Sequence, residues 1–163
     1  MMMNISKIFR VISLVVMASI GSAAFAGHAA INTDDNDLAI KGYDPVAYFT
    51  DKKATKGKAK YTAAHDGAIY HFASAKNRDL FRANADKYAP QYGGFCAFGV
   101  TKNRKFSADP EAWRVVDGKL YLNLNKKVQS IWLEDVPGNI ETSEEIWPEI
   151  KGTTDAYLEA VSS

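Results

Sequence analysis

One cysteine and one histidine are the side chains of this chain best suited to chemistry. Cys96 is the only cysteine in the sequence, and His71 lies in the alternating segment 68–73. A thiolate beside an imidazole can bind Cu(I) or Zn²⁺, or act as a nucleophile with its base. The alternative is structural, because free cysteines are usually buried as small hydrophobes and histidines on sheets are often simply hydrogen-bonded. No Lys or Arg lies within five residues of Cys96, so the local sequence supplies no cation to activate the thiol.

A predicted β-hairpin decides which way His71 points. Asp66-Gly67 stands between two alternating segments, and Asp-Gly at such a place favours a two-residue turn. The turn fixes the register and therefore two faces. One face carries Tyr61, Ala63, His65, Ala68, Tyr70 and Phe72, and the other carries Thr62, Ala64, Ile69, His71 and Ala73. His65 and His71 therefore point apart and cannot chelate one ion together.

A second Asp-Gly pair, at residues 117–118, predicts another hairpin of the same kind. The core face of this hairpin is predicted to carry Trp113, Val115, Leu120, Leu122 and Leu124. The opposite face is predicted to carry Arg114, Val116, Lys119 and Tyr121.

Short helices are predicted around the two hairpins. Asp44 before Pro45 is typical of a helix start, and Ser74 is placed to cap a helix over residues 75–84. Asn125 can cap a further helix, and Thr142 or Ser143 a last short one that ends near Pro148. Hairpins and helices in no regular alternation favour an α+β fold, here a small single domain with two β-hairpins and several short helices.

Four segments of the chain carry a recognisable pattern: 42–49 (GYDPVAYF), 70–74 (YHFAS), 88–97 (YAPQYGGFCA) and 117–123 (DGKLYLN). In these segments the chain resembles exported YHS-domain proteins of unassigned role, and the resemblance spans residues 38–150. The resemblance implies that in YHS modules two cysteines at a strand-to-helix junction hold a soft metal. The matching positions here are Ala73 and Asn77. A methyl group cannot coordinate a metal, and an amide offers only a weak oxygen.

These two departures define the candidate site for a ligand or metal ion. His71 shares the face of Ala73, so it is the first candidate, together with Tyr70, Asn77 and Cys96. The secondary candidates are His65, Tyr43 and Tyr92. Tyrosine hydroxyls favour the edge of the core or a cavity, so the two tyrosines can line a small-molecule pocket.

The first 26 residues read as a secretory signal. Lys7 and Arg10 precede an apolar stretch, and Ala24-Phe25-Ala26 is a small-x-small cleavage pattern. We therefore expect a periplasmic or secreted protein that begins at Gly27. If cleavage leaves Gly27 and His28 at the new N-terminus, they form a weak candidate for a Cu(II) chelate. After the signal we expect a flexible segment over 27–37, the YHS-like domain over 38–150 and a tail or short helix over 151–163.

The sequence predicts a binding or accessory protein rather than an enzyme. It contains no Gly-rich phosphate loop, no Gly-x-Ser-x-Gly, no His-Glu-x-x-His and no Cys-x-x-Cys. No clustered basic face suggests nucleic acid. We expect a monomer that handles a metal ion, a metal-linked ligand or another small ligand, with no structural metal and with Cu or Zn bound only transiently. Two alternatives stay open: a thiol-dependent redox or ligand-modifying enzyme using Cys96, and a docking subunit for a membrane, metalloenzyme or other periplasmic partner.

Overall fold

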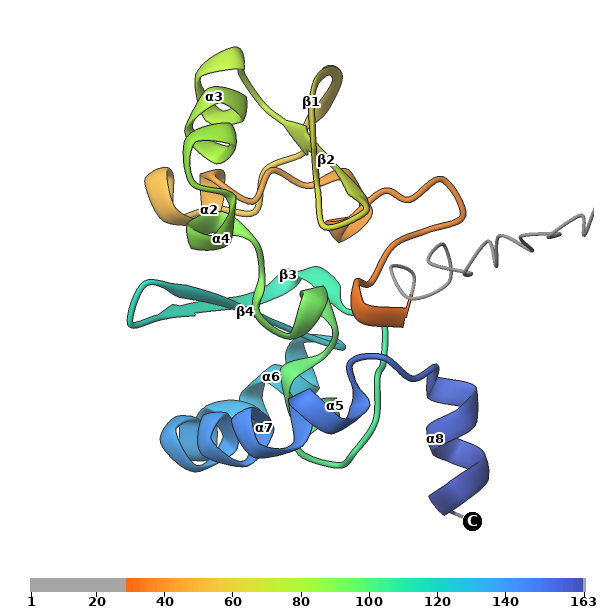
Figure 1. The fold of residues 1–163 in the computed structure, drawn as a ribbon. Coiled ribbons are helices and arrows are strands. Elements are labelled where there is room, and N and C mark those ends of the chain that lie inside the picture. Colours follow the sequence, from red (N-terminus) through yellow and green to blue (C-terminus); the bar gives the residue numbers. More distant parts are fainter. Residues whose placement is uncertain (1–28, 163) are drawn as a thin grey trace, which may run out of the picture.

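Two antiparallel β-hairpins organise the chain, and helices pack on both sides of the second hairpin (Figure 1). The computed structural model describes residues 29–162, with side chains as far as residue 158. Short helices and two-stranded sheets form one small domain, which is the predicted α+β class. Among the described residues, no helix is long and apolar enough to cross a membrane.

The first hairpin has the predicted turn and faces. β1 (Lys58–His65) pairs with β2 (Ala68–Phe72). Asp66 and Gly67 both have positive φ, 49° and 79°, as a type I′ turn requires. The buried residues of the predicted core face are Ala63, Ala68, Tyr70 and Phe72. An irregularity in the pairing between Lys58 and Thr62 ends the regular ladder.

Short helices cover the first hairpin. α3 (Ala75–Ala83) begins as predicted, where Ser74 Oγ accepts a hydrogen bond of 3.1 Å from the amide of Asn77. α2 (Ala47–Thr50) begins later than predicted, because the two residues after Asp44 form a turn. The remaining short helices of this part are η1 (Ile40–Gly42) and α4 (Ala85–Tyr88).

The second half of the chain is mostly helical. Its elements beside the second hairpin are η2 (Gln91–Gly94), α5 (Ala97–Val100), α6 (Lys126–Trp132), η3 (Leu133–Asp135), α7 (Val136–Ile150) and α8 (Asp155–Ser162). Asn125 caps α6 as predicted, accepting a hydrogen bond from the amide of Val128 at 2.9 Å. The prediction of a last short helix capped by Thr142 or Ser143 was wrong. Both residues lie inside α7, which Asp135 caps by accepting a hydrogen bond from the amide of Gly138 at 3.0 Å.

The second hairpin is buried on both faces. β3 (Asp109–Val116) pairs with β4 (Lys119–Asn123) in the predicted register. Leu120 and Leu122 pack into the core around the first hairpin, whereas Tyr121 packs into a second core with Trp132. Tyr121 is only 1% exposed, so placing it away from the core was wrong; helices of the second half cover its face.

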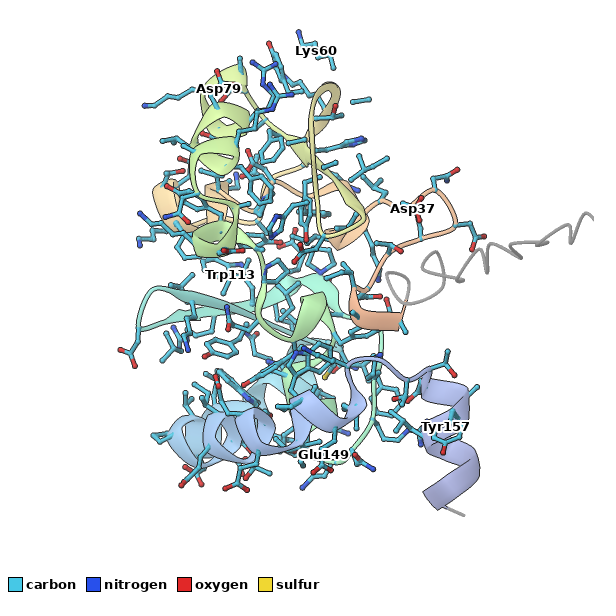
Figure 2. The ribbon with its side chains drawn as sticks, viewed as in Figure 1. Asp37, Lys60, Asp79, Trp113, Glu149 and Tyr157 are labelled. Carbon is cyan, nitrogen blue, oxygen red and sulfur yellow. The ribbon has the colours of Figure 1, made fainter. Side chains whose placement is uncertain are left out.

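Leu124 is the second correction on this hairpin. We predicted it on the core face, but its side chain is 39% exposed. β4 ends at Asn123, so the alternation of faces no longer applies one residue further on. Figure 2 shows how densely side chains fill the two layers on either side of the hairpin.

Candidate functional site

The carboxylate of Asp44 lies at the strand-to-helix junction formed by Ala73 and Asn77, the two positions where the resemblance implies cysteines. Asp44 is completely buried, with 0% exposure. Its Oδ2 accepts hydrogen bonds from the amide of Ala73 at 2.8 Å and from Nδ2 of Asn77 at 2.7 Å. Its Oδ1 accepts from the amides of Val46 at 2.8 Å and Ala47 at 3.3 Å. Four donors therefore compensate a carboxylate that has been removed from water.

We call Asp44, Ala73 and Asn77 the Asp44 network. It joins the segment before α2, the end of β2 and the first turn of α3, over sequence separations of 29 and 33 residues. The sequence predicted Asp44 only as a helix cap. No local spacing rule links residue 44 to the other two positions, so this role could be found only in the folded structure.

His71 lies on β2 opposite Thr62, on the face turned away from the hairpin core. It is half-buried and packs closely on two glycines. A Cβ added at Gly57 would lie 2.6 Å from the His71 Cβ, and one added at Gly42 would lie 3.5 Å from its Nδ1. Close backbone packing therefore surrounds this candidate residue.

Cys96 is sealed in the interior. Its side chain is 1% exposed, and its Sγ accepts a hydrogen bond from the amide of Gly99 at 3.3 Å. The thiol donates a hydrogen bond to Asn123 Oδ1 at 3.8 Å. Burial raises the pKa of the Cys96 thiol above its ordinary value, which disfavours the thiolate. Cys96 forms a parallel bridge with Leu122 of β4 in the second hairpin, whereas His71 lies on β2 of the first hairpin, so the two residues belong to different sheets.

Three other candidates converge on one cleft. His65, Tyr70 and Tyr92 all line a cleft of about 500 Å³ between the first hairpin and the end of α7. Trp147 also lines the cleft, with its ring centroid 5.9 Å from that of Tyr92. The sequence named these three residues as candidates but could not show that they meet, and it gave no sign of Trp147.

Two carboxylates border the same cleft beside His65. The Nε2 of His65 lies 3.5 Å from Asp66 Oδ2 and 3.2 Å from Asp86 Oδ1. The imidazole packs edge-on against the ring of Phe81, with centroids 5.9 Å apart. The hairpin turn supplies Asp66, and α4 supplies Asp86, so two neighbouring elements hold the group together.

A buried lysine fixes the far wall of the cleft. Lys105 is 4% exposed, and its ammonium donates hydrogen bonds to the backbone carbonyls of Ala29, Ile150, Lys151 and Thr153. Burial lowers the pKa of Lys105 to about 8. One side chain thereby ties the start of the described chain to the end of α7. A lysine in a loop directly after Arg104 is typical of the protein surface, so no local pattern indicated this role.

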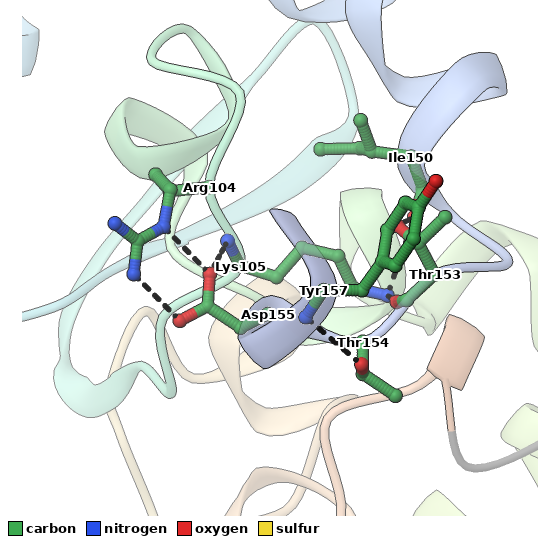
Figure 3. A network of polar contacts seen from close by, with 7 residues as sticks. All are labelled: Arg104, Lys105, Ile150, Thr153, Thr154, Asp155 and Tyr157. Atoms are coloured by element: carbon green, nitrogen blue, oxygen red, sulfur yellow. Dashed lines mark hydrogen bonds and ion pairs between the residues drawn. The ribbon is translucent and has the colours of Figure 1, made fainter. Parts of the chain in front are cut away.

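Arg104 and Asp155 extend this contact to α8 (Figure 3). Arg104 Nε and Nη2 each donate a hydrogen bond of 2.9 Å to the Asp155 carboxylate. The Asp155 carboxylate also accepts a hydrogen bond from the amide of Lys105 at 3.0 Å. The hydrogen bond from Arg104 is the main reason why the pKa of Asp155 lies below its ordinary value.

The other candidate residues lie elsewhere. Tyr43 packs against Lys56, whose Nζ is 4.6 Å from the ring centroid, and it is not part of the cleft wall. Gly27 and His28, the candidate copper chelate, lie outside the described residues. Within the described part of the chain, no group of three or more His, Cys, Asp or Glu side chains is arranged to hold a metal ion.

The fold places the chain in the class of small α+β modules in which a β-hairpin runs through a capped junction into a helix. Residues 46–92 match the YHS domain, so this part of the chain is a YHS domain. The matched region contains Ala73 and Asn77, begins just after Asp44 and ends before Cys96. No curated protein and no solved structure matches the chain.

Proposed function

We propose that the protein is an exported binding or accessory protein whose YHS domain is held together at its junction by a carboxylate rather than by a metal. The Asp44 network carries this proposal. The two positions that would supply thiolates instead donate hydrogen bonds to Asp44, one from a backbone amide and one from a side-chain amide. A carboxylate with four donors has little capacity left for a metal ion.

The burial of Cys96 supports the absence of catalysis. A nucleophilic or redox-active cysteine needs an accessible thiolate, whereas this thiol is 1% exposed and its pKa is raised. The burial of Cys96 therefore argues against the alternative in which the protein is a thiol-dependent enzyme. The docking subunit stays a prediction.

The metal-related role of the YHS family supports an accessory task in which a metal ion or metal-linked ligand is cargo rather than part of the fold. Export is supported by the pattern of residues 1–26, with its basic start, apolar centre and small-x-small end. Cell fractionation checks this part of the proposal. The intact chain should reach the periplasm and begin at Gly27, whereas a chain lacking residues 1–26 should remain in the cytoplasm.

Thiol titration and turnover assays test the absence of catalysis. An aromatic disulfide reagent should label Cys96 only after unfolding, because the folded structure seals the sulfur. The purified protein should show no redox or hydrolytic turnover above background, and neither Cys96→Ser nor His71→Ala should change that rate. Turnover that both substitutions abolish would refute the proposal.

A further inference from the structure

We propose that residues 38–83 and 90–133 are two copies of one structural unit, and that Cys96 closes the junction of the second copy as Asp44 closes that of the first. We call the two segments the first copy and the second copy. This assignment gives Cys96 a role that the proposed function leaves open. It uses the geometry of the Asp44 network and does not depend on the binding role.

The elements follow the same order in both copies. In the first copy the order is η1, α2, β1, β2 and α3, and in the second it is η2, α5, β3, β4 and α6. The Asp-Gly turns at 66–67 and 117–118 are 117 − 66 = 51 residues apart. Ser74 and Asn125 have the same separation, and each caps the helix after its hairpin by accepting from the amide three residues further on. One spacing therefore relates both the turns and the caps.

The two hairpins share an irregularity that their turns do not require. The pairing of β1 with β2 shifts between Lys58 and Thr62, and the pairing of β3 with β4 shifts between Asp109 and Trp113. These positions correspond at the same spacing as the turns. Because such irregularities are retained as features of a fold, a shared one indicates a common structural unit.

The backbone before each hairpin is unusual in the same way. Three consecutive residues have positive φ in each copy: Ile40, Lys41 and Gly42 at 51°, 50° and 78°, and Tyr92, Gly93 and Gly94 at 54°, 60° and 79°. Positive φ is an outlier for branched and bulky side chains such as those of Ile and Tyr. The residues on either side form matching bridges: Leu38 with Ile69 and Tyr43 with Lys56 in the first copy, Pro90 with Leu120 and Phe95 with Ser107 in the second. The copies therefore share strained backbone as well as regular elements.

An aromatic pair lies at the centre of each copy. The ring centroids of Tyr70 and Phe81 are 4.8 Å apart with the planes at 38°, and those of Tyr121 and Trp132 are 5.4 Å apart with the planes at 34°. All four side chains are at most 1% exposed, and each pair belongs to its own core. The equivalence of the copies therefore explains why Tyr121 is buried, since it stands where Tyr70 stands in the first copy.

Cys96 takes the place of Asp44 in the second copy. The Asp44 amide donates a hydrogen bond to the Thr55 carbonyl at 2.8 Å, and the Cys96 amide donates to the Phe106 carbonyl at 2.9 Å. Each residue precedes a helix of four residues, α2 or α5. Asp44 and Cys96 are 96 − 44 = 52 residues apart rather than 51, because the loop that follows is one residue shorter in the second copy.

The side chains of Asp44 and Cys96 accept from equivalent backbone amides. Burial raises the pKa of the Cys96 thiol, and three amides that hydrogen-bond to the sulfur act against this effect: those of Gly99, Leu124 and Phe98. The corresponding amides in the first copy donate to the Asp44 carboxylate: those of Ala47, Ala73 and Val46. Both side chains therefore lie in the same cradle of backbone donors.

One side chain of the junction differs between the copies. Asn77, the fourth donor to Asp44, corresponds to Val128, which has no donor to offer. The Cys96 thiol instead donates to Asn123 Oδ1. A neutral group that both accepts and donates therefore suits the second junction, whereas the first junction suits a carboxylate. The match to the YHS domain ends at residue 92, where the second copy begins.

Serine and valine at position 96 distinguish a junction residue from a packed hydrophobe. A hydroxyl can accept from the amides that point at the sulfur, whereas an isopropyl group leaves them without an acceptor. Cys96→Ser should therefore have a folding equilibrium constant at least about fivefold larger than Cys96→Val in urea unfolding. Val100→Ser is the matched control at a fully buried position of α5, and there the serine variant should be at least about fivefold worse than wild type. Cys96→Val at least as stable as Cys96→Ser would overturn the role of Cys96.

Moving the first junction into the second copy tests the equivalence of the copies. In the Cys96→Asp background, Val128→Asn should improve the folding equilibrium constant at least about fivefold more than it does in wild type, because the new amide lies where Asn77 reaches Asp44. Lys127→Asn, at the exposed preceding position of α6, is the control and should couple to Cys96→Asp by less than about twofold. Equal or absent coupling would overturn the equivalence, and so would a Cys96→Asp chain that stays unfolded with and without Val128→Asn.

Both experiments measure stability, so their failure would leave the binding role in place. The turnover described above would refute that role and leave the two copies unaffected, so the two failures are distinguishable.

Discussion

Asn77 Nδ2 donates a hydrogen bond of 2.7 Å to the completely buried carboxylate of Asp44. Asn77 occupies a position at which the YHS resemblance implies a cysteine ligand. The amide at this position therefore has a defined partner, and the junction is closed by a hydrogen-bond network within the chain.

Removing the Asn77 amide should destabilise the fold. Asn77→Ala leaves Asp44 Oδ2 with one donor fewer, and a hydrogen bond to a charged group contributes about 1.5–3 kcal/mol to stability. The higher helix propensity of Ala offsets about 0.5 kcal/mol of this loss. Urea unfolding should therefore show a net loss of roughly 1–2.5 kcal/mol. Lys76→Ala, at the exposed preceding position of α3, is the matched control and should cost under about 0.5 kcal/mol. Equal losses for the two variants would show that the network adds nothing to stability.

Restoring the two cysteines should create a soft-metal site. Ala73→Cys with Asn77→Cys places two thiols beside Asp44, and competitive titration should show Cu(I) or Zn²⁺ binding at least about tenfold tighter than in wild type, a gap of about 1.4 kcal/mol. Without metal the variant should be less stable than wild type, because the bond from Asn77 to Asp44 is lost.

The same titration separates two accounts of metal binding. Wild type that already binds as tightly as the double variant would contradict the prediction. If Cys96→Ser or His71→Ala then abolished that affinity, a relocated Cys96/His71 site would be the better explanation.

Both faces of the second hairpin should be sensitive to truncation. Leu122→Ala should cost about 2–5 kcal/mol and Tyr121→Ala about 3–5 kcal/mol, because each removes a fully buried side chain from a different core. Arg114→Ala, which alters the exposed residue opposite Tyr121, should cost under about 0.5 kcal/mol. A small effect at Tyr121 would show that the second core is absent in solution.

The contact of α8 should weaken in acid. The hydrogen bond from Arg104 lowers the pKa of folded Asp155, so this carboxylate contributes stability above its unfolded pKa of about 3.9 and loses it as pH falls through the folded value. Wild type should therefore exceed Asp155→Asn in unfolding free energy at pH 7, with a smaller difference at pH 3. Glu149→Gln, an exposed change near the end of α7, should show no such pH-dependent difference. A gap that stays constant with pH would contradict the proposed ionic contact.

Local signals predicted the hairpins because Asp-Gly turns fix register within a few residues. The His65–Ala68 pairing and the Ser74 cap both follow from adjacent sequence. Tyr121 was misplaced because alternation identifies two faces but does not reveal that a second layer of helices covers the polar one. The start of α7 was missed because Thr142 and Ser143 resemble caps, although Asp135 supplies the cap seven residues earlier than Thr142.

The candidate site was predictable only in part. His65, Tyr70 and Tyr92 were named from residue chemistry, but their convergence on one cleft depends on the packing of the first hairpin against the end of α7. The buried roles of Asp44 and Lys105 were not predicted, because each is a charged residue that hydrogen-bonds to residues distant in sequence. Burial of a charge is decided by tertiary contacts, which local patterns do not contain.

The unfolding free energy of the exported protein, measured before and after exhaustive dialysis against chelator, tests the central claim most directly. If the Asp44 network closes the junction, the two values should agree within about 0.5 kcal/mol, and elemental analysis should find no stoichiometric metal before dialysis. A stoichiometric metal that survives ordinary purification, with a stability loss on chelation that the same metal restores, would contradict the account.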